Sequence, residues 1–155
     1  MHNLDKQKTA CSRKTLAASI MTEYHCWTVI RYHPHDTDVN LQDECISSCE
    51  KYLATHQYLT ADKYKIVKYN GIVTFLASGL HNHNDGYIIE IFKWLGQNAI
   101  GSYGLLYYQD DEDKQTVDGF KIYAMKKGKV TEKMDKEFSP RIPTIEAADD
   151  PTRGD

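Results

Sequence analysis

The sequence lacks any run of about 20 apolar residues, the length that a membrane-spanning helix needs. It also lacks the GxSxG, HExxH, P-loop and Rossmann glycine patterns that accompany common catalytic and nucleotide-binding sites. What is present, 41% hydrophobic and 26% charged residues in a chain of 155, is typical of one globular domain. We therefore expect a soluble single-domain protein that needs no cofactor and is not an enzyme.

Cysteine is scarce, with four residues at Cys11, Cys26, Cys45 and Cys49. Cys45 and Cys49 are spaced for adjacent turns of one helix, and Cys11 lies outside the expected domain, so no paired disulfide framework is evident. The close Cys–Cys or Cys–His spacing that a structural zinc site requires is missing as well. The pattern predicts reduced thiols in a cytoplasmic protein that binds no metal.

Most of the chain carries more acidic than basic residues. Residues 1–20 carry four basic residues and one acidic residue, whereas residues 21–155 carry 15 basic and 21 acidic residues, a net charge of −6. A negative chain releases no counterions from nucleic acid, so we expect no nucleic-acid ligand. We interpret residues 1–20 as a disordered leader or an upstream start, residues 21–146 as one domain, and residues 147–155 as a frayed tail.

The first half of the domain shows clear periodic patterns. Alternating aromatic and β-branched residues predict a strand over residues 22–32. Apolar positions at helical spacing between Val39 and His56 predict an amphipathic helix. The dipeptide Asn70-Gly71 lies between two β-rich runs at 64–69 and 72–77, and it predicts a hairpin with a type I′ turn.

The most apolar helix is expected between Ile88 and Leu95, where Glu90 and Lys93 are the polar residues. A helix that is apolar around most of its circumference is covered on more than one side, so we expect Trp94 in the core. Asp85 is placed to cap the first turn, and Gly96 and Asn98 supply stop signals at the end of the helix.

Two further strands are expected at residues 105–109 and 120–125, and the chain beyond Lys126 is charged and irregular. The resulting order is strand, helix, two strands, helix, two strands. It predicts an α+β fold with a single, mainly antiparallel sheet and two helices packed on one face.

One local cluster of titratable residues, His81, His83 and Asp85, lies between an expected strand and an expected helix. Neutral imidazoles two residues apart can act as base and acid or share a metal ion. No further ligand at matching spacing is present, and His and Asn are also ordinary turn residues. We therefore favour a structural turn, with His81 and His83 kept as candidate contacts for a partner.

An acidic run, Asp110 to Asp113, follows two aromatic residues, Tyr107 and Tyr108. Four adjacent acids repel one another and are tolerated in water or opposite a basic partner. Tyrosine buries a large area at low entropy cost and suits protein interfaces. We predict a partner-binding surface here, with Trp27 as a further candidate contact; the alternative is a solvated hairpin loop.

Five ordered blocks carry a resemblance to a known family: Glu23–Trp27, Ser78–His83, Phe92–Trp94, Gly101–Tyr107 with Asp110–Asp113, and Ser139–Glu146. From Met21 to about Glu146 the sequence resembles the immunity protein 7 family of bacterial polymorphic toxin systems. Residues 1–20 lie outside this resemblance.

The resemblance implies a cytoplasmic antitoxin. Such a protein binds the C-terminal toxin domain of a secreted, often Rhs-type, effector and occludes its active site, which protects the producing cell and its kin. The toxin would be a nuclease or an ADP-ribosyltransferase. Two alternatives remain open at this point: a small enzyme that reverses the toxin's modification, and a ligand-binding regulatory module.

Overall fold

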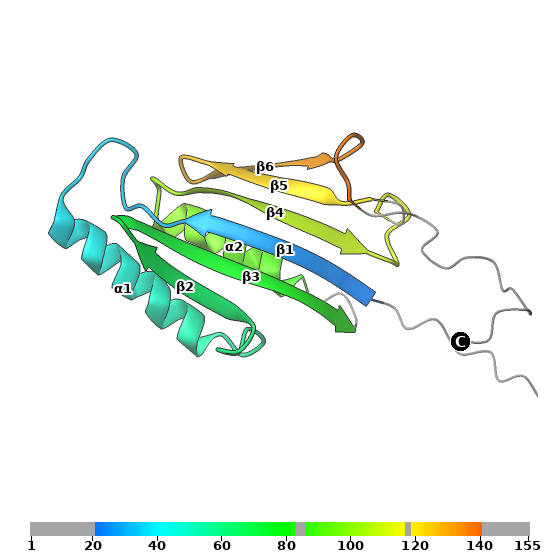
Figure 1. The fold of residues 1–155 in the computed structure, drawn as a ribbon, viewed down its shortest axis with the longest axis horizontal. Coiled ribbons are helices and arrows are strands. Elements are labelled where there is room, and N and C mark those ends of the chain that lie inside the picture. The colour runs from blue at the N-terminus through cyan, green and yellow to red at the C-terminus, as the bar shows by residue number, and fades with distance from the viewer. Residues whose placement is uncertain (1–20, 83–85, 117–118, 141–155) are drawn as a thin grey trace, which may run out of the picture.

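The computed structural model describes residues 21–82, 86–116 and 119–140 (Figure 1). The predicted leader, residues 1–20, and the predicted tail, residues 147–155, lie outside the described residues. Within the described parts the chain forms eight elements: β1 (Met21–Val29), α1 (Val39–Thr55), β2 (Tyr64–Tyr69), β3 (Ile72–Asn82), α2 (Tyr87–Asn98), β4 (Tyr103–Asp110), β5 (Lys121–Lys126) and β6 (Lys129–Met134).

The strands form a single antiparallel sheet in the order β2-β3-β1-β4-β5-β6. The first strand of the chain, β1, therefore lies in the middle and pairs with β3 on one side and β4 on the other. Successive side chains of a strand point to opposite faces, so the alternation along β1 divides the sheet cleanly. Tyr24 and Cys26 are buried on one face, while His25 and Trp27 are exposed on the other.

Both helices cover the face on which Tyr24 lies. Apolar side chains of α2 and α1 join those of the strands in one core cluster, which includes Ile91, Phe92, Leu53, Phe75 and Leu106, all fully buried. Figure 1 shows α2 passing behind the central strands and α1 running beside β2. The predicted α+β fold, with one antiparallel sheet and its helices on one face, is confirmed.

The hairpin between β2 and β3 has the predicted turn geometry. Asn70 has a φ of 49° and Gly71 a φ of 81°, so both central residues are in the left-handed region that a type I′ turn requires. Lys127 and Gly128 make a second turn of this kind, with φ values of 49° and 70°, between β5 and β6. Since β6 exists, the prediction of an irregular chain beyond Lys126 is wrong.

Two local predictions around α2 also need correction. The turn predicted around His81, His83 and Asp85 does not include His81, because β3 extends beyond its predicted end at residue 77 and pairs with β1 as far as Asn82; His83 lies outside the described residues. The residue at the N-cap position of α2 is Gly86, which has a φ of 62° and makes no side-chain capping bond; Asp85 lies outside the described residues.

Of the two predicted stop residues, Asn98 is the last residue of α2, whereas Gly96 lies inside the helix. Gly96 is buried, and a Cβ atom at this position would clash with the carbonyl oxygen of Gly128 in the β5–β6 turn. Gly96 therefore allows that turn to pack closely on α2. Trp94 is half-buried rather than central, and its ring stacks on Tyr52 of α1 with centroids 3.7 Å apart.

Candidate interaction surface

The face of the sheet opposite the helices, here called the open face, carries a broad set of exposed apolar side chains. The register places on it seven of the large apolar residues that remain exposed: Trp27, Val67, Tyr69, Ile72, Leu76, Leu80 and Tyr103. They belong to β1, β2, β3 and the start of β4. Extended apolar patches on a soluble domain commonly mark interaction sites.

Trp27 lies at the centre of this patch. In the register it stands between Leu76 of β3 and Leu105 of β4, and its ring meets Tyr103 edge-on with centroids 6.2 Å apart. The indole is still 39% exposed. Its neighbours thus hold it in a defined orientation while leaving part of its surface for another molecule.

Polar side chains lie next to this patch on the same face. The Nδ1 atom of His25 is 2.7 Å from the Ser78 hydroxyl, and its Nε2 atom is 2.8 Å from a carboxylate oxygen of Glu23. The three groups form an acid–imidazole–hydroxyl line on an exposed strand surface. The groove described below does not include them. The line fixes the orientation of the imidazole, and sequence reasoning missed it because 53 residues separate His25 from Ser78.

The predicted acidic run is divided by the fold. Asp110 ends β4 and is only 4% exposed; its carboxylate accepts a hydrogen bond from the backbone N–H of Glu112, and its backbone pairs with the hydroxyl of Thr116. Asp111 and Glu112 are exposed beyond the strand end. Asp113 lies 3.6 Å from the ammonium of Lys121. Asp110 is thus buried in the loop. Asp111 and Asp113 also take part in its structure, because their carboxylates accept from the Gln109 amide at 2.6 Å and from the Gln115 N–H at 2.9 Å.

The two predicted tyrosines point to opposite faces. Tyr108 lies in the core with 5% of its surface exposed, and its ring meets Tyr123 edge-on. Tyr107 is half-buried on the open face, where it meets Phe120 edge-on at 5.9 Å. Of the pair, Tyr107 is therefore the one that a partner could reach.

His81, one of the two predicted histidine contacts, does not join this surface. His81 lies on β3 with the parity of the helix-covered face, and its ring contacts Tyr87 of α2 at 5.9 Å. His83 lies outside the described residues. Of the predicted contacts, Trp27 and Tyr107 lie on one face of the sheet. Asp111, Glu112 and Asp113 lie at the end of the sheet where β1 begins, since the Asp111 N–H donates to the carbonyl of Met21.

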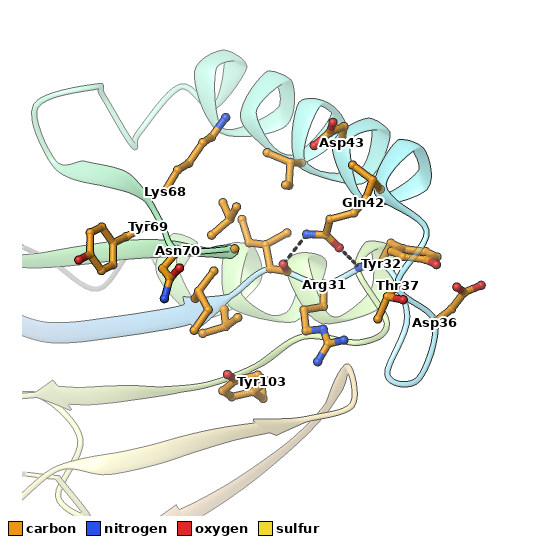
Figure 2. A pocket seen from close by; sticks show the side chains of 17 residues that line it. Arg31, Tyr32, Asp36, Thr37, Gln42, Asp43, Lys68, Tyr69, Asn70 and Tyr103 are labelled. Atoms are coloured by element: carbon orange, nitrogen blue, oxygen red, sulfur yellow. Dashed lines mark hydrogen bonds between the residues drawn. The ribbon is translucent and has the colours of Figure 1, made fainter.

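A groove of about 700 Å³ lies at the opposite end of the sheet, where β1 leaves for α1 (Figure 2). Its apolar lining includes Ile30, Ile46 and Val73, while Tyr69, Ile72 and Tyr103 belong to both the groove and the open face. No signal in the sequence indicated it, because its walls come from β1, α1, the β2–β3 hairpin and β4.

The side-chain amide of Gln42 holds the groove together at the point where β1 ends. Its nitrogen donates to the carbonyl of Ile30 at 2.9 Å, and its oxygen accepts from the N–H of Tyr32 at 3.0 Å, as the dashed lines in Figure 2 show. The amide continues the hydrogen bonding of the strand and ties α1 to it. These two bonds fix the position of α1 relative to the end of β1, where the groove lies.

The charged groups of the groove differ in how they are neutralised. Lys68 lies 2.7 Å from a carboxylate oxygen of Glu50. A hydrogen bond from Tyr32, together with the N–H of Asp38, lowers the pKa of the Asp36 carboxyl. The Arg31 guanidinium makes no ion pair within the described part of the chain, and Figure 2 shows it on the side of the groove that holds Tyr103.

Among the described residues, no group of three His, Cys, Asp or Glu side chains is arranged to hold a metal ion. None of the helices in the described segments has the length and apolar character needed to cross a membrane.

Within the described residues, the fold is that of a small α+β domain whose sheet exposes an apolar patch on the face opposite the helices. Residues 21–147 match the immunity protein 7 family, and the chain belongs to this family. The comparison with curated proteins and the comparison with solved structures yield no match. The match begins where β1 begins and spans every element of the sheet.

Proposed function

We propose that this protein is an antitoxin that binds the C-terminal toxin domain of a cognate polymorphic, Rhs-type effector and neutralises it by covering its active site. The observation that carries the proposal is the family match, which extends over the whole described domain. The neutralised enzyme would be a nuclease or an ADP-ribosyltransferase, acting in the cytoplasm where the antitoxin is present.

The acidic end of the sheet supports a partner with a basic surface. Asp111, Glu112 and Asp113 extend beyond β4 next to Glu23, in a domain whose residues carry a net negative charge. Enzymes that act on nucleic acids or nucleotides bind phosphates with basic clefts, and complementary charge accelerates association. We therefore assign these acids, with Trp27 and Tyr107 on the adjoining open face, to the contact with the toxin.

Neutralisation by binding requires no turnover, and the acid–imidazole–hydroxyl line on the open face does not change this expectation. His25, Glu23 and Ser78 lie on an exposed strand surface, and among the described residues they line neither the groove beside Arg31 nor the hollow beside Asp135, where a substrate could be positioned and water excluded. Their hydrogen bonds suit a polar edge to a protein interface.

The test is a titration of the toxin domain encoded by the adjacent gene with the purified protein. Occlusion predicts that toxin activity falls linearly and reaches zero near one antitoxin per toxin, with a stable complex on size-exclusion chromatography. If a small fraction of one equivalent restores all of the modified target, the protein is instead a reversing enzyme. If neither binding nor protection occurs, it does not neutralise this toxin.

A further inference from the structure

We propose that the toxin docks on the open face of the sheet, with Trp27 as the central anchor, and inserts a protruding apolar segment into the groove beside Arg31. This inference rests on the proposed function and specifies which surface performs it.

The open face has an apolar surface that the fold itself leaves uncovered. Exposed fractions range from 39% for Trp27 and Leu76 to 80% for Tyr69, and the seven residues lie on contiguous strands. The helix-covered face, by contrast, buries its side chains almost completely. An apolar patch that stays exposed lowers the solubility of the domain. A partner that covers the patch removes this disadvantage.

The composition of the patch is also that of binding hot spots. Trp and Tyr dominate such sites because they bury a large area with few rotatable bonds. Trp27 is held edge-on against Tyr103, and both rings keep about two fifths of their surface exposed. The two side chains are therefore already in place to be covered by a partner.

The groove adjoins the apolar patch of the open face and adds a concave surface to it. Tyr69, Ile72 and Tyr103 lie on the open face and also line the groove, whose interior is apolar at Ile46 and Val73. A volume of about 700 Å³ is large enough for a turn or loop with one or two large side chains. A flat partner would leave this space empty.

The groove and the charge together favour the toxin over a second copy of this chain. A second copy laid sheet to sheet would present another pleated strand surface rather than a protruding segment. Residues 21–155 carry a net charge of −6, which at long range favours a basic toxin domain over a second copy.

Arg31 defines a second property of the inserted segment. Its backbone is held by Gly101 and Ser102, and its guanidinium has no carboxylate partner among the described residues. A half-buried guanidinium gains most from a carboxylate that arrives with desolvating apolar neighbours. The segment that enters the groove should therefore carry an acidic residue next to its apolar side chain.

The experiment measures the affinity of the full-length protein for the adjacent effector's C-terminal toxin domain after Trp27→Ala and Tyr103→Ala. Removing a central aromatic anchor weakens binding by about 30-fold or more. Tyr58→Ala is the matched control, because Tyr58 has a similar exposed fraction, 48% against 41% for Tyr103, but lies on the helix-covered side against Tyr87. The control should bind within about twofold of the parent, since surface substitutions away from a contact change little.

A second set of variants tests the groove. Ile72→Glu places a charge at the groove rim, and Arg31→Gln removes the cation while keeping a polar side chain of similar length; each should weaken binding by about tenfold or more. Thermal melts of all variants establish that they fold. Hydrogen exchange of the complex should show protection on β1, β3 and the start of β4.

The outcomes separate this inference from the proposed function. If the parent protein binds the toxin and all four variants bind as tightly as the Tyr58→Ala control, the docking surface lies elsewhere while the antitoxin function stands. If the parent does not bind, the proposed function itself fails. If the parent is a dimer that Trp27→Ala dissociates without loss of toxin binding, a second copy covers the open face and the inference is overturned.

Discussion

The phenol oxygens of Tyr24 and Tyr87 lie 2.8 Å apart in the core, where they share a hydrogen bond between β1 and the first turn of α2. Their rings meet edge-on, with centroids 6.0 Å apart. Gly79 stands opposite Tyr24 in the register, and a Cβ atom there would come within 2.9 Å of the Tyr24 phenol oxygen. A glycine in the middle of β3 thus makes room for the contact that attaches α2 to the centre of the sheet.

The Tyr24–Tyr87 pair should contribute measurably to stability. Tyr24→Phe and Tyr87→Phe should each lower the free energy of unfolding by about 1–2 kcal/mol, because a buried hydroxyl loses its partner. Together they should cost less than the sum, with a coupling energy of about 1 kcal/mol. Urea denaturation of the parent and the three variants gives these values. A coupling energy near zero would mean that the hydroxyls do not form this bond in solution.

The stack of Trp94 on Tyr52 should be a weaker element than its size suggests. Trp94 is half-buried, with its ring parallel to Tyr52 within 7°, so Trp94→Ala should cost about 1–3 kcal/mol, below the 3–5 kcal/mol typical of a fully buried aromatic. Phe92→Ala, two residues away and fully buried, is the control and should cost the larger amount. Equal losses for the two variants would contradict the observed difference in burial.

The three described cysteines should differ in reactivity. Burial raises the pKa of the Cys26 thiol to about 12, so almost no thiolate exists there at pH 8. On α1, Cys49 donates a hydrogen bond to Cys45. This bond lowers the pKa of the Cys45 thiol and raises the pKa of the Cys49 thiol. Iodoacetamide at pH 8 should therefore label Cys45 first, as read by peptide mass spectrometry, and reach Cys26 and Cys49 only after denaturation.

Equal labelling rates for the three thiols in the folded protein would show that the core opens on the timescale of the reaction. The described cysteines carry no disulfide.

A chain that begins at Met21 should fold and neutralise the toxin as well as the full chain. The family match begins at residue 21, and β1 begins at the same residue. Equal melting temperatures and equal protection of cells that express the toxin are the expected results. Loss of either property would assign a structural or binding role to residues 1–20.

The sequence was informative wherever local chemistry decides structure. Asn70-Gly71 tolerates positive φ at both positions, so the hairpin could be predicted without knowledge of the sheet. The helices followed from apolar spacing, and α1 ends within one residue of the predicted limit at His56. These features depend on neighbours in the chain.

Features that depend on distant pairing could not be predicted in the same way. The polar residues from Ser78 to Asn82 are typical of a turn, yet they extend β3 because β1 supplies backbone partners along their whole length. The edge strand β6 carries two lysines and was predicted to be irregular because of its charge. Charged side chains are, however, common on edge strands, where they oppose aggregation.

The interaction surface was predicted only in part for the same reason. Adjacent residues in a strand face opposite sides, so the sequence named Tyr107 and Tyr108 together while the sheet separates them. The acidic run likewise concealed the structural role of Asp110. The groove and its Arg31 arise from four elements that meet only in the folded chain.

The surface acids of the β4–β5 loop should accelerate association with the toxin. Asp111→Asn, Glu112→Gln and Asp113→Asn, made together, should leave the fold intact. Asp110 and its hydrogen bonds remain, and the amide oxygens that replace the carboxylates of Asp111 and Asp113 can still accept from Gln109 and Gln115. The expected result is slower association, approaching the 10⁵–10⁶ M⁻¹s⁻¹ typical of unsteered pairs, with a much flatter dependence on salt, since exposed charges act over roughly 8–10 Å at ordinary ionic strength. Stopped-flow measurements across a salt series test both.

A second triple variant, Glu44→Gln, Asp62→Asn and Glu90→Gln, removes the same amount of charge from exposed positions on or beside the two helices. If steering depends on the loop, this control should keep most of the parent's association rate and salt dependence, because its charges lie away from the docking face. If both triple variants slow association equally, only the net charge matters. If the loop variant associates at the parent's rate at every salt concentration, the acidic run is a solvated connection between β4 and β5, and the contact with the toxin depends on the apolar surface around Trp27 alone.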